Sequence, residues 1–292
     1  MTKINFYHSL IFFNLCITLA GIEYLREGSF LIISLFLILT IGISHGSLDH
    51  IKGKKLIKYL GYKSISVFYL GYIFVGITTI IIWLIFPKFL LFLFLIIAAF
   101  HFGKEDSEFI DKKKNFELVY FLKGSLIIIA PLFFHKGETL EIFETLNFNI
   151  SNSFIIANEI LIIFILLSLV SGVFLSLKKN IEVKSLLLMD YLSILVLNYF
   201  LNPIIAFTVY FCFLHSIRHS MSLINEINKN LKKGLPIFIK KALPLTILTI
   251  IGYILSILVL NNYNELNETI YQVIFIGLAS LTFPHILLEY LI

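Results

Sequence analysis

The chain has 292 residues, of which 59% are hydrophobic and only 14% are charged. Its mean hydropathy of +0.94 excludes a soluble globular domain. The net charge of +5 comes from lysines gathered in loops between apolar segments, a pattern that reflects membrane topology and does not indicate nucleic-acid binding.

Apolar segments of about 20 residues, long enough to cross roughly 30 Å of hydrocarbon, recur along the whole chain. Their apolar runs are continuous, which favours helices over a β-barrel. We therefore predict a single all-α integral-membrane domain over residues 1–292, a polytopic transmembrane helical bundle. In chain order, its about ten spans are expected over residues 8–25, 29–50, 64–86, 88–106, 117–135, 153–177, 185–201, 203–223, 242–260 and 268–291.

The basic residues predict the orientation of these spans. Lysine-rich stretches occur at 52–63, 104–114, 178–184 and 229–241, whereas the stretch 138–144 is acidic. Loops rich in Lys and Arg stay in the cytoplasm. We therefore expect a multi-pass protein of the cell (inner) membrane with both termini in the cytoplasm.

Six of the eight histidines lie in four short polar clusters inside or at the end of these spans. The clusters are His45-Gly-Ser-Leu-Asp-His50, His101-Phe-Gly-Lys-Glu-Asp106, His215-Ser-Ile-Arg-His219 and Pro284-His285. In the predicted topology the four spans run in the same direction, so all four clusters lie near their cytoplasmic ends. Ionisable residues in a membrane are costly and mark functional sites, and imidazoles at one depth predict a buried metal centre.

Helical spacing suggests a role for some of these residues. His215 and His219 are four residues apart, so about 40° separates them on a helix and both could bind one ion. His45 shares a face with Asp49, whereas His50 would lie about 140° from His45. We expect His45 to be a ligand and Asp49 an outer carboxylate that orients it.

Further outer residues are expected around the metal. Glu105 and Asp106 follow His101, and Glu289 lies one turn after His285. Arg218 could pair with Asp49 or Asp106, or extend to the membrane surface. For single histidines, a helix–helix hydrogen bond is the alternative to metal binding, and for His50 and His285 the outer or structural role is favoured. The two remaining histidines, His8 and His135, are expected at the ends of spans, away from the centre.

The four clusters, in this order on a chain of this length, resemble the Brp/Blh family of bacterial and archaeal membrane β-carotene 15,15′-dioxygenases. The resemblance implies an Fe(2+)-dependent oxygenase that splits the central double bond of β-carotene with O2 to give two all-trans-retinal molecules. By position in the motifs, it implies that the iron ligands are His45, His101, His215 and His219. It also implies a microbial rhodopsin as a functional neighbour that uses the retinal.

Such a substrate is a stiff hydrocarbon about as long as the bilayer core is thick, ~30 Å. Cleavage at its centre requires a tunnel that extends in both directions from the metal. Aromatic residues that flank the histidines are candidates for the tunnel walls, although each could instead be ordinary packing. They are Phe100, Phe102, Tyr210, Phe211, Phe213 and Phe283.

Three other functions are compatible with parts of this pattern. A di-iron membrane hydroxylase or desaturase would use about eight histidines in HxxxH and HxxHH boxes, by resemblance to those families, and this chain has a single HxxxH. A metal transporter often has internal repeats and broken helices near the midplane, and no repeat is found here. A non-enzymatic rhodopsin assembly factor is the third alternative.

Overall fold

The computed structural model describes residues 2–22, 25, 30–44, 46–107, 109–110, 116–148 and 157–291. Within these ranges the chain is helical apart from turns and short connections, with no strand. The α-helices are α1 (Thr2–Ala20), α3 (Leu31–Leu37), α4 (Asp49–Tyr59), α5 (Ser66–Ile85), α6 (Pro87–Glu105), α7 (Glu117–Phe134), α8 (Lys136–Thr145), α9 (Asn158–Ser176), α10 (Ile181–Phe200), α11 (Pro203–Val209), α12 (Ile217–Ile227), α13 (Leu231–Leu260) and α14 (Leu266–Leu291). The predicted all-α polytopic bundle is confirmed.

Nine helices in the described part of the chain are long and apolar enough to cross a membrane. They correspond to nine of the predicted spans. The remaining predicted span, residues 8–25, lies mostly in α1, which is not among the nine because Lys3, Asn5, His8 and Asn14 lower its hydropathy. The acidic stretch 138–144, which lies between two predicted spans, forms the short helix α8.

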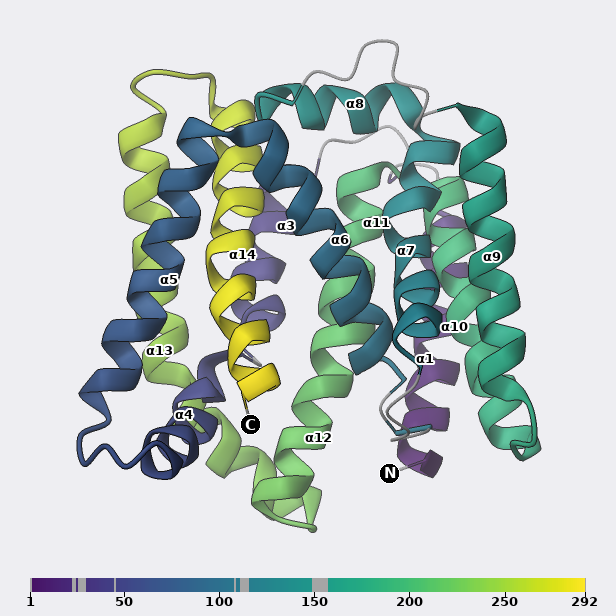
Figure 1. Cartoon of the computed structure of the whole chain (residues 1–292). Coiled ribbons are helices and arrows are strands. Elements are labelled where there is room, and N and C mark those ends of the chain that lie inside the picture. Colours follow the sequence, from purple (N-terminus) through teal and green to yellow (C-terminus); the bar gives the residue numbers. More distant parts are fainter. Residues whose placement is uncertain are drawn as a thin grey trace.

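The helices are arranged around one central span that joins α11 to α12 (Figure 1). The helix α8 lies across one end of the bundle, at the top of Figure 1, and α4 lies toward the other end. The end of α14 and the start of α1 are both in the lower half of the view, as are the carboxyl end of α6 and all of α12. These ends carry most of the predicted histidine clusters.

The central span is not a regular α-helix. Between α11 and α12 it contains a π-helix, η4 (Tyr210–Ser216), and a second π-helix, η1 (Ile38–Gly42), follows α3. The two π-helices pack together, since the Ser216 hydroxyl donates a hydrogen bond of 2.8 Å to the carbonyl oxygen of Gly42. Helical segments of this kind frequently mark functional sites, and His215 belongs to η4.

Helices α6 and α7 make the closest backbone contact that positions the site. A Cβ atom at Gly103 would collide with the carbonyl oxygen of Tyr120, and one at Gly124 would collide with that of Ala99. Glycine at both positions therefore lets the two backbones touch, as small residues do between membrane helices. This contact fixes the carboxyl end of α6, where His101 lies.

Replacing Gly124 with leucine is expected to separate α6 from α7, because the colliding atom belongs to the backbone and cannot turn aside. We expect a loss of roughly 1–3 kcal/mol of unfolding free energy, measured as a lower midpoint of unfolding in sodium dodecyl sulfate. Gly71→Leu on α5 is the matched control, since a Cβ there meets nothing within 4 Å. Equal midpoints for the two variants would contradict the close-contact interpretation.

Candidate metal centre

Four buried imidazoles from three separate stretches of the chain lie together. They are His101 on α6, His215 in η4, His219 on α12 and His285 on α14. The ring centroid of His101 lies 5.4 Å from that of His215 and 5.3 Å from that of His285, and the rings of His285 and His219 are 5.9 Å apart. We call these four residues the imidazole cluster.

His45, the remaining predicted ligand, lies outside the described residues. Its neighbours can be placed, however. Gly46 and Ser47 line a cavity whose wall also includes His101, His215 and His285. The described chain on the carboxyl side of position 45 is therefore next to the imidazole cluster, and the role of His45 as a ligand stays a prediction.

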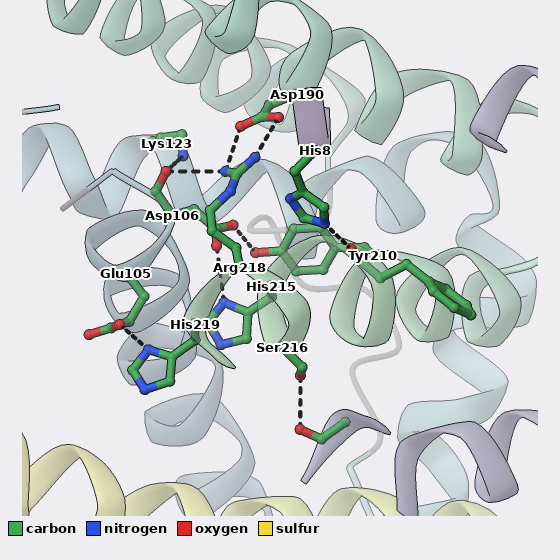
Figure 2. A network of polar contacts seen from close by, with 12 residues as sticks. His8, Glu105, Asp106, Lys123, Asp190, Tyr210, His215, Ser216, Arg218 and His219 are labelled. Atoms are coloured by element: carbon green, nitrogen blue, oxygen red, sulfur yellow. Dashed lines mark hydrogen bonds and ion pairs between the residues drawn. The ribbon is translucent and has the colours of Figure 1, made fainter. Parts of the chain in front are cut away.

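Three histidines of the cluster are each held by a carboxylate from another helix. The Nδ1–H group of His215 donates to Asp106 (3.1 Å), that of His219 to Glu105 (2.6 Å) and that of His285 to Asp49 (2.8 Å). Figure 2 shows the first two pairs. Each bond directs the Nε2 lone pair away from the carboxylate, which is the arrangement that orients a metal-binding histidine.

The position of His285 differs from the sequence interpretation, which favoured an outer or structural role. Its side chain is only 4% exposed and lies in the cluster with the same carboxylate support as His215 and His219. Ligand atoms of His101, His285 and Glu289 all lie within 4.8 Å of one another. Since α14 runs along the cluster, its i, i+4 pair His285 and Glu289 points the same way. Both residues are thus candidate ligands.

The outer carboxylates are present, and each supports a histidine with which the sequence did not pair it; the pairing of Asp49 with His45 lies outside the described residues. Helical spacing paired Asp49 with His45, and Glu105 and Asp106 with His101. In the structure, Asp49 supports His285 and also accepts a hydrogen bond from the Tyr72 hydroxyl (2.9 Å). Residues one turn apart share a face of their helix. In this structure the carboxylates on that face extend to a histidine of a neighbouring helix and do not turn back to their own.

Two further residues around the centre have local partners. His50 donates from Nδ1 to the carbonyl oxygen of Ser47 (2.9 Å) and lines the cavity. Glu289 forms an ion pair with Lys52, which links α14 to α4. At the other end of the bundle His135 contacts Glu138 (3.4 Å), in agreement with its exclusion from the site.

Arg218 does not pair with the carboxylate of Asp49 or Asp106, the two predicted partners. Its guanidinium binds both carboxylate oxygens of Asp190 on α10, at 2.7 and 3.0 Å (Figure 2). It also donates to the Ser9 hydroxyl at 2.8 Å. It does not reach Asp49, and it touches Asp106 through that residue's carbonyl oxygen at 3.3 Å. Arg218 is only 3% exposed, and a charge buried this deeply requires a carboxylate at the same depth. Sequence reasoning missed Asp190, although a single acidic residue within an apolar span was a usable signal.

Asp106 connects this ion pair to the imidazole cluster. One carboxylate oxygen accepts from His215 and the other from the Tyr210 hydroxyl (2.6 Å). Its carbonyl oxygen accepts from Lys123 (3.2 Å) as well as from Arg218. Figure 2 shows that the His215 ring is anchored through Asp106 to a buried network that crosses the bundle. The His8 ring, predicted at the end of a span and away from the centre, donates to the carbonyl oxygen of Phe213 (2.8 Å).

The cavity beside the cluster has a volume of about 300 Å³ and mostly apolar walls. Of the six aromatic residues predicted to line a tunnel, Phe102 and Phe211 do so. The other four have different contacts and are not part of this wall. Phe100 stacks on Tyr290, Phe283 packs on Phe94, Tyr210 holds Asp106, and Phe213 offers its carbonyl oxygen to His8.

The donor set suits a divalent transition metal. Imidazole nitrogens bind iron, copper and zinc, and two histidines with one carboxylate and open positions are typical of non-haem Fe(II) oxygenases. His101, His285 and Glu289 are such a set, and His215 and His219 add two further imidazoles. The residues present therefore fit the implied metal.

The fold and the site define a polytopic helical membrane protein with imidazoles and carboxylates gathered beside an apolar cavity. The sequence model of the β-carotene 15,15′-dioxygenase family matches residues 36–292. The chain therefore belongs to the β-carotene 15,15′-dioxygenase family, a family of carotenoid-cleaving oxidoreductases.

A curated relative agrees with this assignment. The chain is 28% identical over 263 residues to a protein named beta-carotene 15,15′-dioxygenase from uncultured marine bacterium 66A03, covering 87% of this chain and 91% of the relative. No solved structure matches the chain significantly. Membership of this family favours carotenoid cleavage over the hydroxylase, transporter and assembly-factor alternatives.

Proposed function

We propose that this protein splits the central 15,15′ double bond of β-carotene with O2 and releases two all-trans-retinal molecules. The observation that carries the proposal is the imidazole cluster, three of whose rings are held by carboxylates next to an apolar cavity. Two carbonyl groups replace one carbon–carbon double bond. One O2 therefore supplies both oxygen atoms and accepts the electrons, and no further reductant is needed.

Fe(II) is the proposed cofactor, and when bound it supplies the redox chemistry that makes O2 reactive. His101, His215 and His219 are the proposed ligands, together with His45 by resemblance to the family. His285 and Glu289 join this set because of their distance from His101. Neutral imidazoles do not offset the charge of a divalent ion in a medium of low dielectric constant. The carboxylates of Asp49, Glu105 and Asp106, each hydrogen-bonded to one imidazole of the cluster, would provide this compensation.

The surroundings of the cluster support a hydrocarbon substrate. Phe102 and Phe211 contribute ring faces and edges to the cavity, and Ile43, Leu278 and Leu281 add aliphatic walls. No polar group is needed to bind a polyene, so the shape of the cavity must position the double bond. The same apolar walls limit the access of water to the reacting carbons.

We also propose a bilayer location in the cell (inner) membrane, with both termini in the cytoplasm. The lysine-rich segments and the acidic helix α8 support this orientation, because α8 lies at the opposite end of the bundle from α4 (Figure 1). A substrate dissolved in the bilayer would then reach the site without crossing water. The retinal would be supplied to a microbial rhodopsin, with no contact between the two proteins required.

Expression in cells that accumulate β-carotene is expected to bleach their orange pigment and to produce retinal. Pigment absorbance and chromatography of the extracted retinoids are the measurements. Cells that express the His101→Ala variant should keep their colour. Unchanged pigment in cells that contain folded, iron-loaded protein would refute the proposed function.

A further inference from the structure

A second cavity adjoins the first and extends in another direction. Its volume is about 80 Å³, and it is lined by residues of α6, α7, α8, α11, η4 and α14. Four residues line both cavities and so form the partition between them. They are Phe102, Phe211, Leu278 and Thr282. The rings of Phe102 and Phe211 meet edge to face at 6.2 Å, and His101 and His215 lie in the wall of the first cavity beside this partition.

The first cavity reaches the outer surface of the bundle. Its walls include Ile73 on α5 and Leu248 on α13, which are 56% and 64% exposed. Both helices lie at one side of the bundle (Figure 1), and their apolar side chains would face lipid. A substrate dissolved in the bilayer can therefore enter here.

The far end of the second cavity is closed by buried residues. None of the described residues that line it is exposed. Its far end lies under α8, where Thr139, Ile142 and Phe143 form the wall together with Pro131 of α7 and Pro203 of α11. We call this cavity the blind chamber. Since α8 lies across the end of the bundle (Figure 1), the chamber extends from the imidazole cluster toward that end.

The distance along α14 from the chamber wall at Phe275 to His285 matches half of the length of the substrate. On α14 the wall extends from Phe275 to Thr282, and His285 follows. The ten residues from Phe275 to His285 correspond to about 15 Å along a helix. Half of a molecule as long as the bilayer core, ~30 Å, is also about 15 Å. A substrate end stopped under α8 would thus bring the molecule's centre to the imidazoles.

We infer that the blind chamber binds one half of the carotenoid and that its closed end under α8 selects the central double bond for cleavage. The other half would occupy the first cavity and extend toward the opening between α5 and α13. The Phe102 and Phe211 rings must turn to admit the polyene between the two cavities, and the chamber of about 80 Å³ must widen to hold half of the molecule. This inference rests on the proposed function and adds to it a residue-level basis for the position of cleavage.

Changing the depth of the chamber at Ile142 tests the inference. Ile142→Trp shortens the chamber and is expected to lower β-carotene cleavage by at least roughly tenfold. An apocarotenal that lacks one ring end but keeps the 15,15′ bond should still be cleaved at the wild-type rate. Ile142→Ala deepens the chamber, so β-carotene should slide further in and give two aldehydes of unequal length. The products are identified by chromatography and mass spectrometry.

The control is Ile163→Trp, the same substitution on the outer face of α9, where the side chain is 53% exposed. This variant should cleave both substrates at the wild-type rate and give the wild-type products. Retained apocarotenal cleavage shows that Ile142→Trp is folded, and Ile142→Ala gives an independent readout by product length. Wild-type rates and equal products from both Ile142 variants would overturn the inference. Failure of wild-type protein to cleave either substrate would instead refute the proposed function.

Discussion

Replacing His101 with alanine is expected to lower both bound iron and retinal formation by at least about a hundredfold. His101 lies between His215 and His285, with ring centroids 5.4 and 5.3 Å away, so its loss removes the middle of the proposed ligand set. We expect the same result at His45, His215 and His219. Iron is measured by elemental analysis of purified protein and retinal by chromatography. About one iron per wild-type chain is expected for a mononuclear site.

Two comparisons make this prediction selective. His285→Ala should resemble His101→Ala because His285 lies in the cluster, whereas His50→Ala should keep most of the iron since the His50 ring bonds to the local Ser47 carbonyl. His135→Ala, at the other end of the bundle, should be unchanged. Equal losses at His135 and His101 would contradict the site, and two irons per chain would support the di-iron alternative.

Removal of the carboxylate at position 190 is expected to be the most destabilising single change in the buried network. Asp190→Ala leaves the Arg218 guanidinium, which is 3% exposed, without its carboxylate partner. An uncompensated charge at such a site costs about 3–5 kcal/mol. The measurement is the midpoint of unfolding in sodium dodecyl sulfate, compared with the wild type.

A double replacement separates this charge effect from lost packing. Asp190→Leu combined with Arg218→Met removes both charges and keeps similar volumes, so much of the stability should return. Lys184→Ala on the same helix, at an exposed position, is the control and should change little. A double variant as unstable as Asp190→Ala would show that the ion pair's charge is not the cause.

The sequence predicted the residues of the centre better than their partners. Histidines are conspicuous in apolar spans, because each needs a compensating interaction there. His101, His215, His219 and His285 were found in this way. Their partners depend on how helices cross. Asp106 follows the last residue of α6, and the chain direction at that end brings it to His215 instead of His101.

The same limit applies to the tunnel. Six aromatic residues were predicted near the metal because they lie close to histidines in the sequence. A helix, however, directs neighbouring side chains about 100° apart. Phe102 and Phe211 therefore line the cavities, while Phe100 and Phe213 point elsewhere. The helix α8 was missed because its sequence is short and polar, and its position over the blind chamber depends on packing that no local pattern contains.

The π-helix η4 lets the central span hold one more residue without turning the helix that follows it. A π-helical turn contains about one residue more than an α-helical turn. In a regular α-helix an added residue would turn everything beyond it by about 100°. In η4 the wider turn takes up that residue, so Arg218 and His219 still face Asp190 and Glu105. Deleting one residue between Tyr210 and Ser216 should therefore narrow the turn that carries His215 and leave the Arg218–Asp190 pair in place.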